Sequence, residues 1–132
     1  MIELGVVQLV KSSASVIAIA PVGGFFAQLP NDQSLPSWTY LGVSQTANYD
    51  LVSPTSLYMR RVQIDCYGKT AADSIVLAKA IDNVLNGYRG TLTDPDHVFV
   101  DGCFQTNLID YFDPDSRTFR RMLEYQLWFT TS

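Results

Sequence analysis

The chain has 132 residues, the length of a single domain. Hydrophobic residues make up 47% of it and aromatic residues 12%, which is enough for a packed core and excludes a disordered chain. Nine Lys and Arg residues stand against 13 Asp and Glu residues, a net charge of −4. Because affinity for DNA comes mainly from neutralising phosphates, this balance disfavours DNA binding as the main task and suits a protein that DNA passes without adhering.

Apolar runs are short, as the one at residues 16–20 shows by ending at Pro21. A membrane span needs about 20 apolar residues in a row, so none is predicted. Glu3 precedes every Lys and Arg, which argues against a secretory signal. We therefore expect a soluble protein that is made in the cytoplasm and has no membrane association.

The start of the chain predicts helix. Apolar residues recur at helical spacing over residues 2–10, with Glu3 in the first turn, where the helix dipole favours an anion. Ser12 and Ser13 are placed to end this helix or to cap a second short one that runs to residue 20. Pro21 and the two glycines that follow it then break the pattern.

Two strands are predicted next. Residues 25–29 read as a short edge strand that Pro30 stops, and residues 31–36 as a loop. Residues 38–45 are rich in aromatic and β-branched side chains, which favour a strand.

A polar segment at residues 46–56 predicts a long loop. Loops of about this length inside a compact domain are usually functional or disordered. We therefore interpret it as an interface element, with Tyr49 and Leu51 as its apolar anchors and Asn48 and Asp50 as their polar surround.

The middle of the chain carries the strongest pattern. Residues 58–67 alternate between apolar and polar side chains, as a half-buried strand does. A helix is predicted at residues 70–86, with Thr70 as N-cap, Asp73 completing a variant capping box and Gly87 at the position of a left-handed C-cap. One face of this helix is an apolar stripe of Leu77, Ala78, Ile81, Val84, Leu85 and Tyr88.

The last third predicts a long hairpin. Residues 97–102 and 104–111 form one strand with a bulge at Gly102, and residues 113–116 form a turn. Residues 118–130 alternate again and complete the hairpin. The whole pattern predicts a single α+β domain, in which the helix of residues 70–86 packs on one face of a mostly antiparallel sheet, beside a short N-terminal helical segment.

Convergent catalytic groups are not visible in the sequence. The one histidine, His97, lies near Asp94, Asp96 and Asp101, and two carboxylates with an imidazole can hold a divalent metal. Their spacing matches no known metal loop, and Asp-Pro-Asp is ordinary turn chemistry. We therefore predict no metal, no cofactor and no enzymatic activity.

The two cysteines, Cys66 and Cys103, form no C-x-x-C pair and are too few for a disulfide scaffold. Each lies in a predicted strand. We expect both to be small buried hydrophobic residues.

Two arginine doublets, Arg60-Arg61 and Arg120-Arg121, lie near the start of predicted strands. Because strand side chains alternate, Arg60 and Arg121 should each share an otherwise apolar face. A charge there is costly unless it is paired or lies at the rim of the sheet. One interpretation makes them rim residues that reach water. The other pairs them with carboxylates of a neighbouring subunit, since Arg suits buried interface ion pairs.

Several segments together resemble the tail completion, or tail terminator, family of long-tailed phages, prophages and gene transfer agents, over nearly the whole chain. The segments that carry the resemblance are Leu35-Pro36-x-x-Thr39-Tyr40, Arg61-Val62-Gln63-Ile64-Asp65-Cys66-Tyr67-Gly68, Val84-Leu85-Asn86-Gly87, Gly90-Thr91-Leu92, the arginines at 117 and 120, and Tyr125-Gln126-Leu127-Trp128-Phe129. The run Val-Gln-Ile-Asp before an alanine-rich helix is the most specific of them.

The resemblance implies a structural virion protein without catalytic residues, located at the neck of the tail and assembled in the host cytoplasm. Six copies would form a ring on the tail tube, bind the tail tube protein and a head-closure or connector protein, and let DNA through. Ring closure requires two different patches on each subunit. The arginine doublets are candidates for one patch, and Asp50 or Asp65 for the other. A head-closure or adaptor protein, and a small enzyme or ligand-binding domain, remain alternatives.

Overall fold

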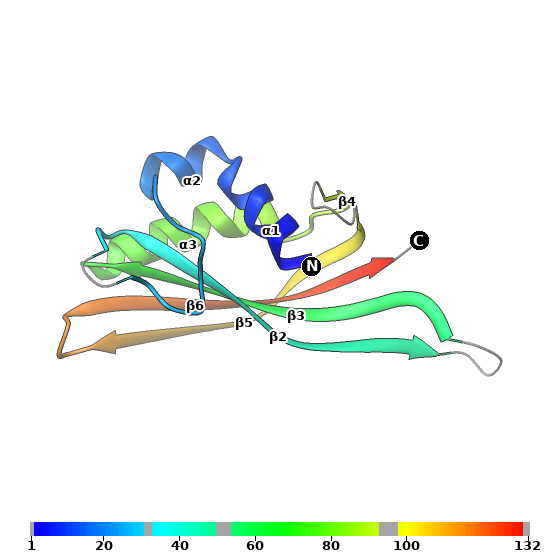
Figure 1. Cartoon of the computed structure of the whole chain (residues 1–132). Coiled ribbons are helices and arrows are strands. Elements are labelled where there is room, and N and C mark those ends of the chain that lie inside the picture. The colour runs from blue at the N-terminus through cyan, green and yellow to red at the C-terminus, as the bar shows by residue number, and fades with distance from the viewer. Residues whose placement is uncertain (1, 31–32, 50–53, 93–97, 131–132) are drawn as a thin grey trace.

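The computed structural model describes residues 2–30, 33–49, 54–92 and 98–130. In these residues one six-stranded sheet lies under three helices (Figure 1). The elements in chain order are α1 (Ile2–Lys11), α2 (Ala14–Ile19), β1 (Phe25–Phe26), β2 (Ser37–Tyr49), β3 (Pro54–Gly68), α3 (Ala71–Leu85), β4 (Gly90–Thr91), β5 (Phe99–Asp113) and β6 (Thr118–Thr130). The sheet order is β1-β2-β3-β6-β5-β4, antiparallel except for the pairing of β1 with β2. The predicted α+β fold is confirmed.

Helix α3 forms as its sequence predicts. The Thr70 hydroxyl accepts a hydrogen bond from the backbone N–H of Asp73 at 3.1 Å, which satisfies one of the free donors of the first turn. At the other end Gly87 has a φ of 84°, the left-handed conformation that ends a helix most easily at glycine. Between the two caps, Leu77, Ile81 and others of the apolar stripe are buried on the sheet.

The core lies between the helices and one face of the sheet. Alternate residues of β3 and β6 point into it, so each strand has one buried face. The helix layer contributes the buried valines of α1 and α2 to the same cluster. The strand residues of this face that are buried include Trp38, Val62, Ile64, Cys66, Val100, Cys103, Leu123, Tyr125, Leu127 and Phe129.

The sheet is much longer than the helices that cover it. The 15 residues of α3 span about 22 Å at 1.5 Å per residue, whereas the 15 residues of β3 reach about 50 Å. The β2–β3 hairpin therefore extends beyond the helices at one end, and the β5–β6 hairpin forms the opposite end (Figure 1). None of the helices in the described ranges is long and apolar enough to cross a membrane.

The predicted loop at residues 46–56 was wrong. Strand β2 continues to Tyr49 and β3 begins at Pro54, and these two residues pair, so only residues 50–53 separate the strands. Polar composition suggested a loop because this end of the hairpin extends beyond the helix layer, where a strand needs no apolar alternation. The strand predicted at residues 25–29 is also shorter, since Ala27 has a φ of 62° and ends β1 at Phe26.

Strand β5 contains the predicted bulge. Val100 pairs with Phe129 and Gly102 with Trp128, so Asp101 is the extra residue. A second shift lies between Gln105 and Asn107, further along the same strand. Bulges of this kind increase the local twist, which contributes to the curl of the sheet visible in Figure 1.

Candidate assembly interface

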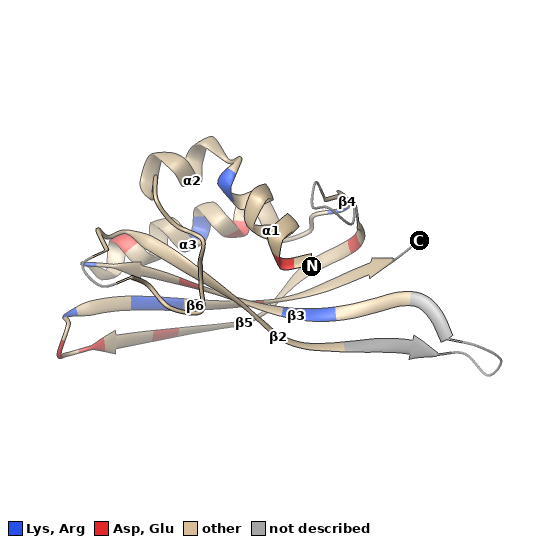
Figure 2. Ribbon diagram, viewed as in Figure 1, with Lys and Arg blue, Asp and Glu red and all other residues tan. Residues whose placement is uncertain are grey.

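The two arginine doublets lie on neighbouring strands but at different points along the sheet, since Arg60 and Arg61 are opposite Leu127 and Gln126. Strands β3 and β6 are neighbours, and their register places Tyr67 opposite Arg120. Figure 2 shows the basic residues of these strands in blue among acidic residues in red. Each of the four guanidinium groups forms an ion pair with a carboxylate of the same chain.

Arg120 lies on the sheet face away from the helices, where Asp65 holds it. Its Nε atom donates to Oδ1 of Asp65 at 3.1 Å, and the Asp65 side chain is only 8% exposed. The amide of Gln63 donates to the other carboxylate oxygen at 2.9 Å. The guanidinium carbon lies 4.8 Å from the ring centre of Tyr111 and 5.9 Å from that of Tyr67. Two aromatic rings and a buried carboxylate therefore fix the position of this cation.

Arg61 occupies the same face, closer to the middle of the sheet. Its Nη2 and Nε atoms both donate to Oε1 of Glu124, at 2.7 and 3.1 Å. The Thr106 hydroxyl donates to the same oxygen at 3.3 Å. The pair links β3 to β6 and, through Thr106, to β5.

The other member of each doublet lies on the helix side, as the alternation predicts. Arg60 pairs with the buried carboxylate of Glu3 in α1. Arg121 donates two hydrogen bonds to Asp110 on β5, at 2.7 and 3.0 Å. The hydrogen bond from Arg121 lowers the pKa of the Asp110 carboxyl, although that side chain is 59% exposed.

The predicted site residues thus fall into two groups. Asp65 and the four arginines form one set of paired charges across β3 and β6, closed within a single chain. Asn48 and Tyr49 lie in β2 at the far end of the hairpin, and Asp50 and Leu51 lie outside the described residues. The assignment of both groups to an interface stays a prediction.

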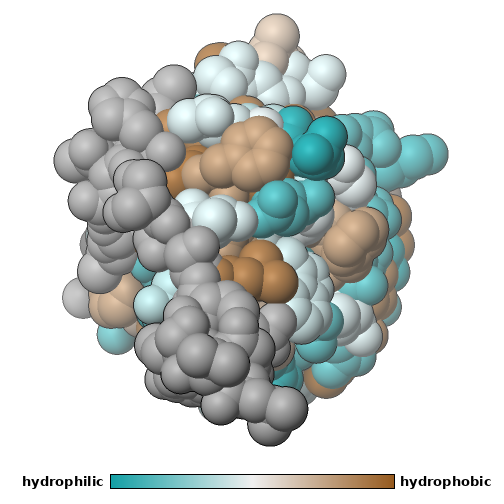
Figure 3. Space-filling model, turned by 90° about the vertical axis from the view of Figure 1, so that its right-hand side faces the viewer, coloured by the Kyte–Doolittle hydropathy of each residue, from teal (hydrophilic) through white to brown (hydrophobic). Residues whose placement is uncertain are grey.

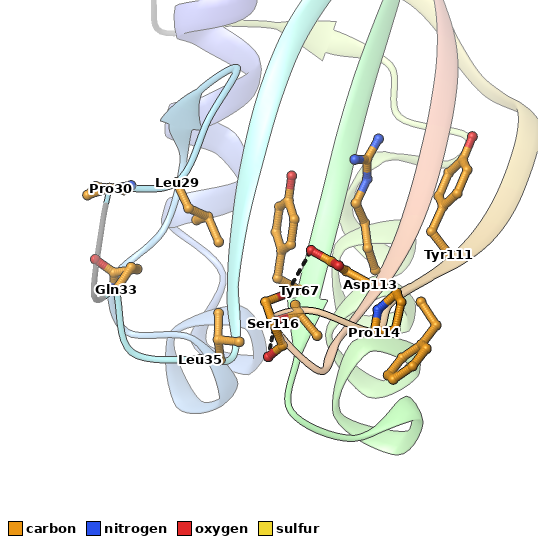
Figure 4. Close-up of a pocket in the computed structure, with 12 residues that line it drawn as sticks. Leu29, Pro30, Gln33, Leu35, Tyr67, Tyr111, Asp113, Pro114 and Ser116 are labelled. Carbon is orange, nitrogen blue, oxygen red and sulfur yellow. Dashed lines mark hydrogen bonds between the residues drawn. The ribbon is translucent and has the colours of Figure 1, made fainter.

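A pocket at the β5–β6 end of the molecule was not predicted. It has a volume of about 670 Å³ and lies between the β5–β6 turn and the segment that contributes Leu29, Pro30, Gln33 and Leu35 (Figure 4). Leu35, Tyr67 and Phe112 contribute to its walls, and Arg120 is the one cation among its lining residues. The sequence signal was present, since Leu35, Tyr67 and Arg120 all belong to segments that carried the family resemblance, but only the fold brings them together.

Asp113, the acidic residue of this pocket, is engaged by its own turn. Its carboxylate accepts hydrogen bonds from the backbone N–H of Asp115 at 3.0 Å and from the Ser116 hydroxyl at 2.9 Å, the latter drawn in Figure 4. These bonds lower the pKa of the Asp113 carboxyl. The charged residues of the pocket, Asp113 and Arg120, are thus both engaged within the chain, Arg120 by Asp65.

The opposite end of the molecule has a mixed surface. Figure 3 looks toward the end where the β2–β3 hairpin lies, and its described surface alternates between hydrophobic and hydrophilic residues. A contact made at this end would therefore combine apolar and polar groups.

The described part of the chain holds no cluster of three or more His, Cys, Asp or Glu residues that could bind a metal ion. His97 and its neighbours Asp94 and Asp96 lie outside that part, and Asp101 is exposed and accepts a hydrogen bond from Thr130 at 2.6 Å.

Both cysteines are free and buried in the core. Burial raises the pKa of the Cys66 thiol and raises that of Cys103 to about 12. A nucleophilic cysteine acts as the thiolate, so these two are placed as core residues.

A core on one side of the sheet, arginines paired within the chain and a sheet that extends beyond its helices define an α+β domain of the chain's described residues. The family model described as "Tail completion protein gp17" matches residues 5–130. The chain therefore belongs to the tail completion protein gp17 family, and it is a structural protein of the virion tail.

Among solved structures, the chain is similar to one from the "Virion of native gene transfer agent (GTA) particle". The two superpose with a TM-score of 0.80 at 13% sequence identity, over 97% of this chain and 93% of the other. At this identity the match shows a shared fold. A comparison with curated proteins found no match.

Proposed function

We propose that this protein forms a ring, with six subunits, on the end of the finished tail tube. There it stops the addition of tube subunits and offers the surface on which the head-closure or connector protein docks. The family and the fold support this role. The observation that carries it is the extension of the sheet beyond its helices, which gives each subunit two unlike ends. Ring closure requires such a pair of different patches.

The charge arrangement supports a ring that DNA crosses without specific binding. Counterion release from phosphates needs cations that are available to the DNA. The arginines of β3 and β6 are instead neutralised by Glu3, Asp65, Asp110 and Glu124 of their own chain. The role is structural rather than enzymatic, and the one sheet and one core cluster support a single domain over residues 1–132.

Purified protein mixed with tail tubes tests the proposal. We expect electron micrographs to show a six-fold ring on one tube end, and tubes with rings to stop growing when tube subunits are added. Uncapped tubes from the same preparation are the control for growth. A protein that stays monomeric and never decorates a tube end contradicts the proposal. Binding to head connectors without tubes favours a head-closure protein instead.

A further inference from the structure

We propose that the open edge of β5, residues 107–113, pairs with the open edge of β2, residues 41–45, of a second copy of this chain. The sheet then continues from one subunit to the next. This contact rests on the ring of the proposed function and names the two surfaces that join its subunits.

Strand β5 lies at the edge of the sheet over most of its length. Strand β4 pairs only with its first two residues (Figure 1). A little further on, the N–H of Gly87 donates to the carbonyl of Cys103 at 2.6 Å, and Oδ1 of Asn86 accepts from the N–H of Gln105 at 3.3 Å. From residue 107 to residue 113, no described residue outside β5 hydrogen-bonds to the backbone on this outer side.

The alternation of backbone groups along β5 identifies the free donors. The N–H of Gln105 points away from β6, and the bulge that follows moves this orientation to Leu108, Asp110 and Phe112. The N–H of Leu108 donates to Oδ1 of its neighbour Asn107 at 3.0 Å. The outward N–H groups of Asp110 and Phe112 have no partner among the described residues, so an added strand can accept from both.

Apolar side chains are exposed along the same stretch. Leu108 is 42% exposed, Tyr111 46% and Phe112 51%. Ile75 of α3, 40% exposed, lies about three helical turns before Asn86, which bonds to β5, so it lies on the side of the helix that faces this strand. Proteins usually protect an edge strand with Lys or Pro, and residues 107–113 contain neither. This edge therefore suits the addition of a strand.

The opposite edge of the same sheet supplies a matching strand. Strand β1 pairs with β2 only at Thr39 and Tyr40, and beyond them no described strand covers the outer side of β2. The four long strands β2, β3, β6 and β5 alternate in direction, so β5 runs opposite to β2. A copy in the same orientation therefore adds its β2 to β5 as an antiparallel neighbour, which is the pattern of the sheet itself.

Charge favours β2 over a second β5 as the added strand. Two β5 strands paired about their centres would place Asp110 of one chain opposite Asp110 of the other, and like charges directly opposite each other are unfavourable. Residues 41–45 of β2 are Leu, Gly, Val, Ser and Gln, which carry no charge. The contact therefore joins two different surfaces, as ring closure requires.

Joining these edges displaces each subunit along the strands. Within one chain the register places Gly42 level with Gln105, through Val62 and Tyr125. The centre of the open edge of β5, at Asp110, lies about 15 Å further along the strand. A sheet that closes on itself needs a fixed stagger between its strands, and this displacement provides it.

Cysteine crosslinking tests the contact in assembled rings. Gln45→Cys and Leu108→Cys place one thiol on each open edge, both on the helix side of the sheet. The two native thiols are buried. With a short bismaleimide, rings of the double variant should yield covalent ladders up to the ring size on a denaturing gel. The matched control pairs Gln45→Cys with Ile17→Cys, which is exposed on α2 and should yield no ladder.

A proline tests the backbone pairing itself. In the crosslinking background, Asp110→Pro removes an outward N–H and should lower the crosslinked fraction about tenfold at fixed concentration. Asp110→Ala is the matched control, since it loses the same ion pair with Arg121 but keeps the N–H, and it should leave the ladder unchanged. In wild-type rings, the amides of Asp110 and Phe112 should exchange hydrogen at least about tenfold more slowly than in free subunits.

The outcomes separate the contact from the proposed function. Rings seen by electron microscopy without a ladder and without slower exchange overturn the contact and leave the ring intact. Covalent dimers from Leu108→Cys alone, or a crosslink to the tube protein in place of the ladder, overturn β2 of a second copy as the added strand. Equal ladders from Asp110→Pro and Asp110→Ala overturn the backbone pairing. If no ring forms on tube ends and no ladder appears, the ring and the contact are both rejected.

Discussion

The phenol of Tyr125, on β6, donates a hydrogen bond to Oδ1 of Asp82, on α3, at 2.7 Å. Tyr125 is fully buried, so this bond joins the centre of the sheet to the helix that covers it. Its acceptor is a carboxylate and its donor is buried, which places it among the stronger hydrogen bonds of a protein.

Replacing Tyr125 with Phe should lower the free energy of unfolding by about 1.5–3 kcal/mol, because Asp82 loses its donor. Urea denaturation measures the change. Tyr88→Phe is the control, since the Tyr88 hydroxyl makes only a long 3.5 Å bond to the backbone of Thr91, and its cost should stay within about 0.5 kcal/mol. Equal costs for the two variants would show that the Asp82 bond contributes little.

Stability should decline in alkali. Burial raises the pKa of Tyr125 above its ordinary value of 10.0 and that of Cys103 from 9.0 to about 12. In the unfolded chain these groups release their protons first, so the unfolded state gains free energy from ionisation that the folded state does not. The stabilisation is therefore complete below about pH 9 and is lost progressively as the pH rises toward about 12. Urea titrations across this range measure the decline in the free energy of unfolding. Tyr125→Phe should make that decline shallower. A wild-type free energy of unfolding that does not change with pH contradicts the prediction.

Neighbouring arginines should differ sharply in their effect on stability. Arg120→Ala leaves the carboxylate of Asp65, which is 8% exposed, without its cation. We expect the free energy of unfolding to fall by about 2–4 kcal/mol. This is less than for a deeply buried pair, because Arg120 itself is partly exposed. Arg121→Ala frees Asp110, which is 59% exposed, and should cost no more than about 1 kcal/mol. Thermal unfolding of the two variants compares them directly, and equal losses would refute the role assigned to burial.

Gly42 leaves room for the buried ion pair between Glu3 and Arg60. A Cβ atom at this position would collide with the side chains of both partners. Gly42→Ala should therefore push the pair apart and destabilise the protein by about 1–3 kcal/mol, within the usual range for overpacking. Gly87→Ser is the comparison, because a Cβ at Gly87 meets nothing and the cost there comes only from the positive φ. Calorimetry should show Gly42→Ala as the more damaging change.

Shortening the β2–β3 hairpin should separate folding from function. Replacing residues 48–57 with an Asn-Gly turn joins the paired residues Ala47 and Tyr58, removes the end of the hairpin and spares the buried part of β3, from Val62 onward. We expect a cooperative unfolding transition within about 1–2 kcal/mol of wild type, together with loss of ring formation on tube ends. A shortened chain that still caps tubes would assign the docking surface elsewhere.

Much of the fold could be predicted because burial leaves a periodic signature. The stripe of α3 and the alternation of β6 both arise from a single buried face, and the predicted limits of these two elements are within one residue of those in the structure. Strand β3 begins four residues earlier than its alternation predicts. The end of the β2–β3 hairpin extends beyond the helix layer, and its sequence carries no such signature. The pocket was beyond sequence reasoning for another reason: Leu35, Tyr67 and Arg120 meet only through the strand order and register, which no local pattern encodes.

The two bulges of β5 explain how 15 residues run beside the 13 of β6. Each adds one residue and so exchanges the set of side chains on the helix side of the sheet. Before the bulge at Asp101 this set is even-numbered and includes Val100, and after it the set is odd-numbered and includes Cys103. After the second bulge, at Thr106, the set is even-numbered again and includes Leu108. Their effects cancel. Loss of one extra residue alone would turn every later side chain of β5 to the wrong face, whereas loss of both would preserve the pattern. Insertions and deletions in this strand should therefore be inherited in pairs across the family.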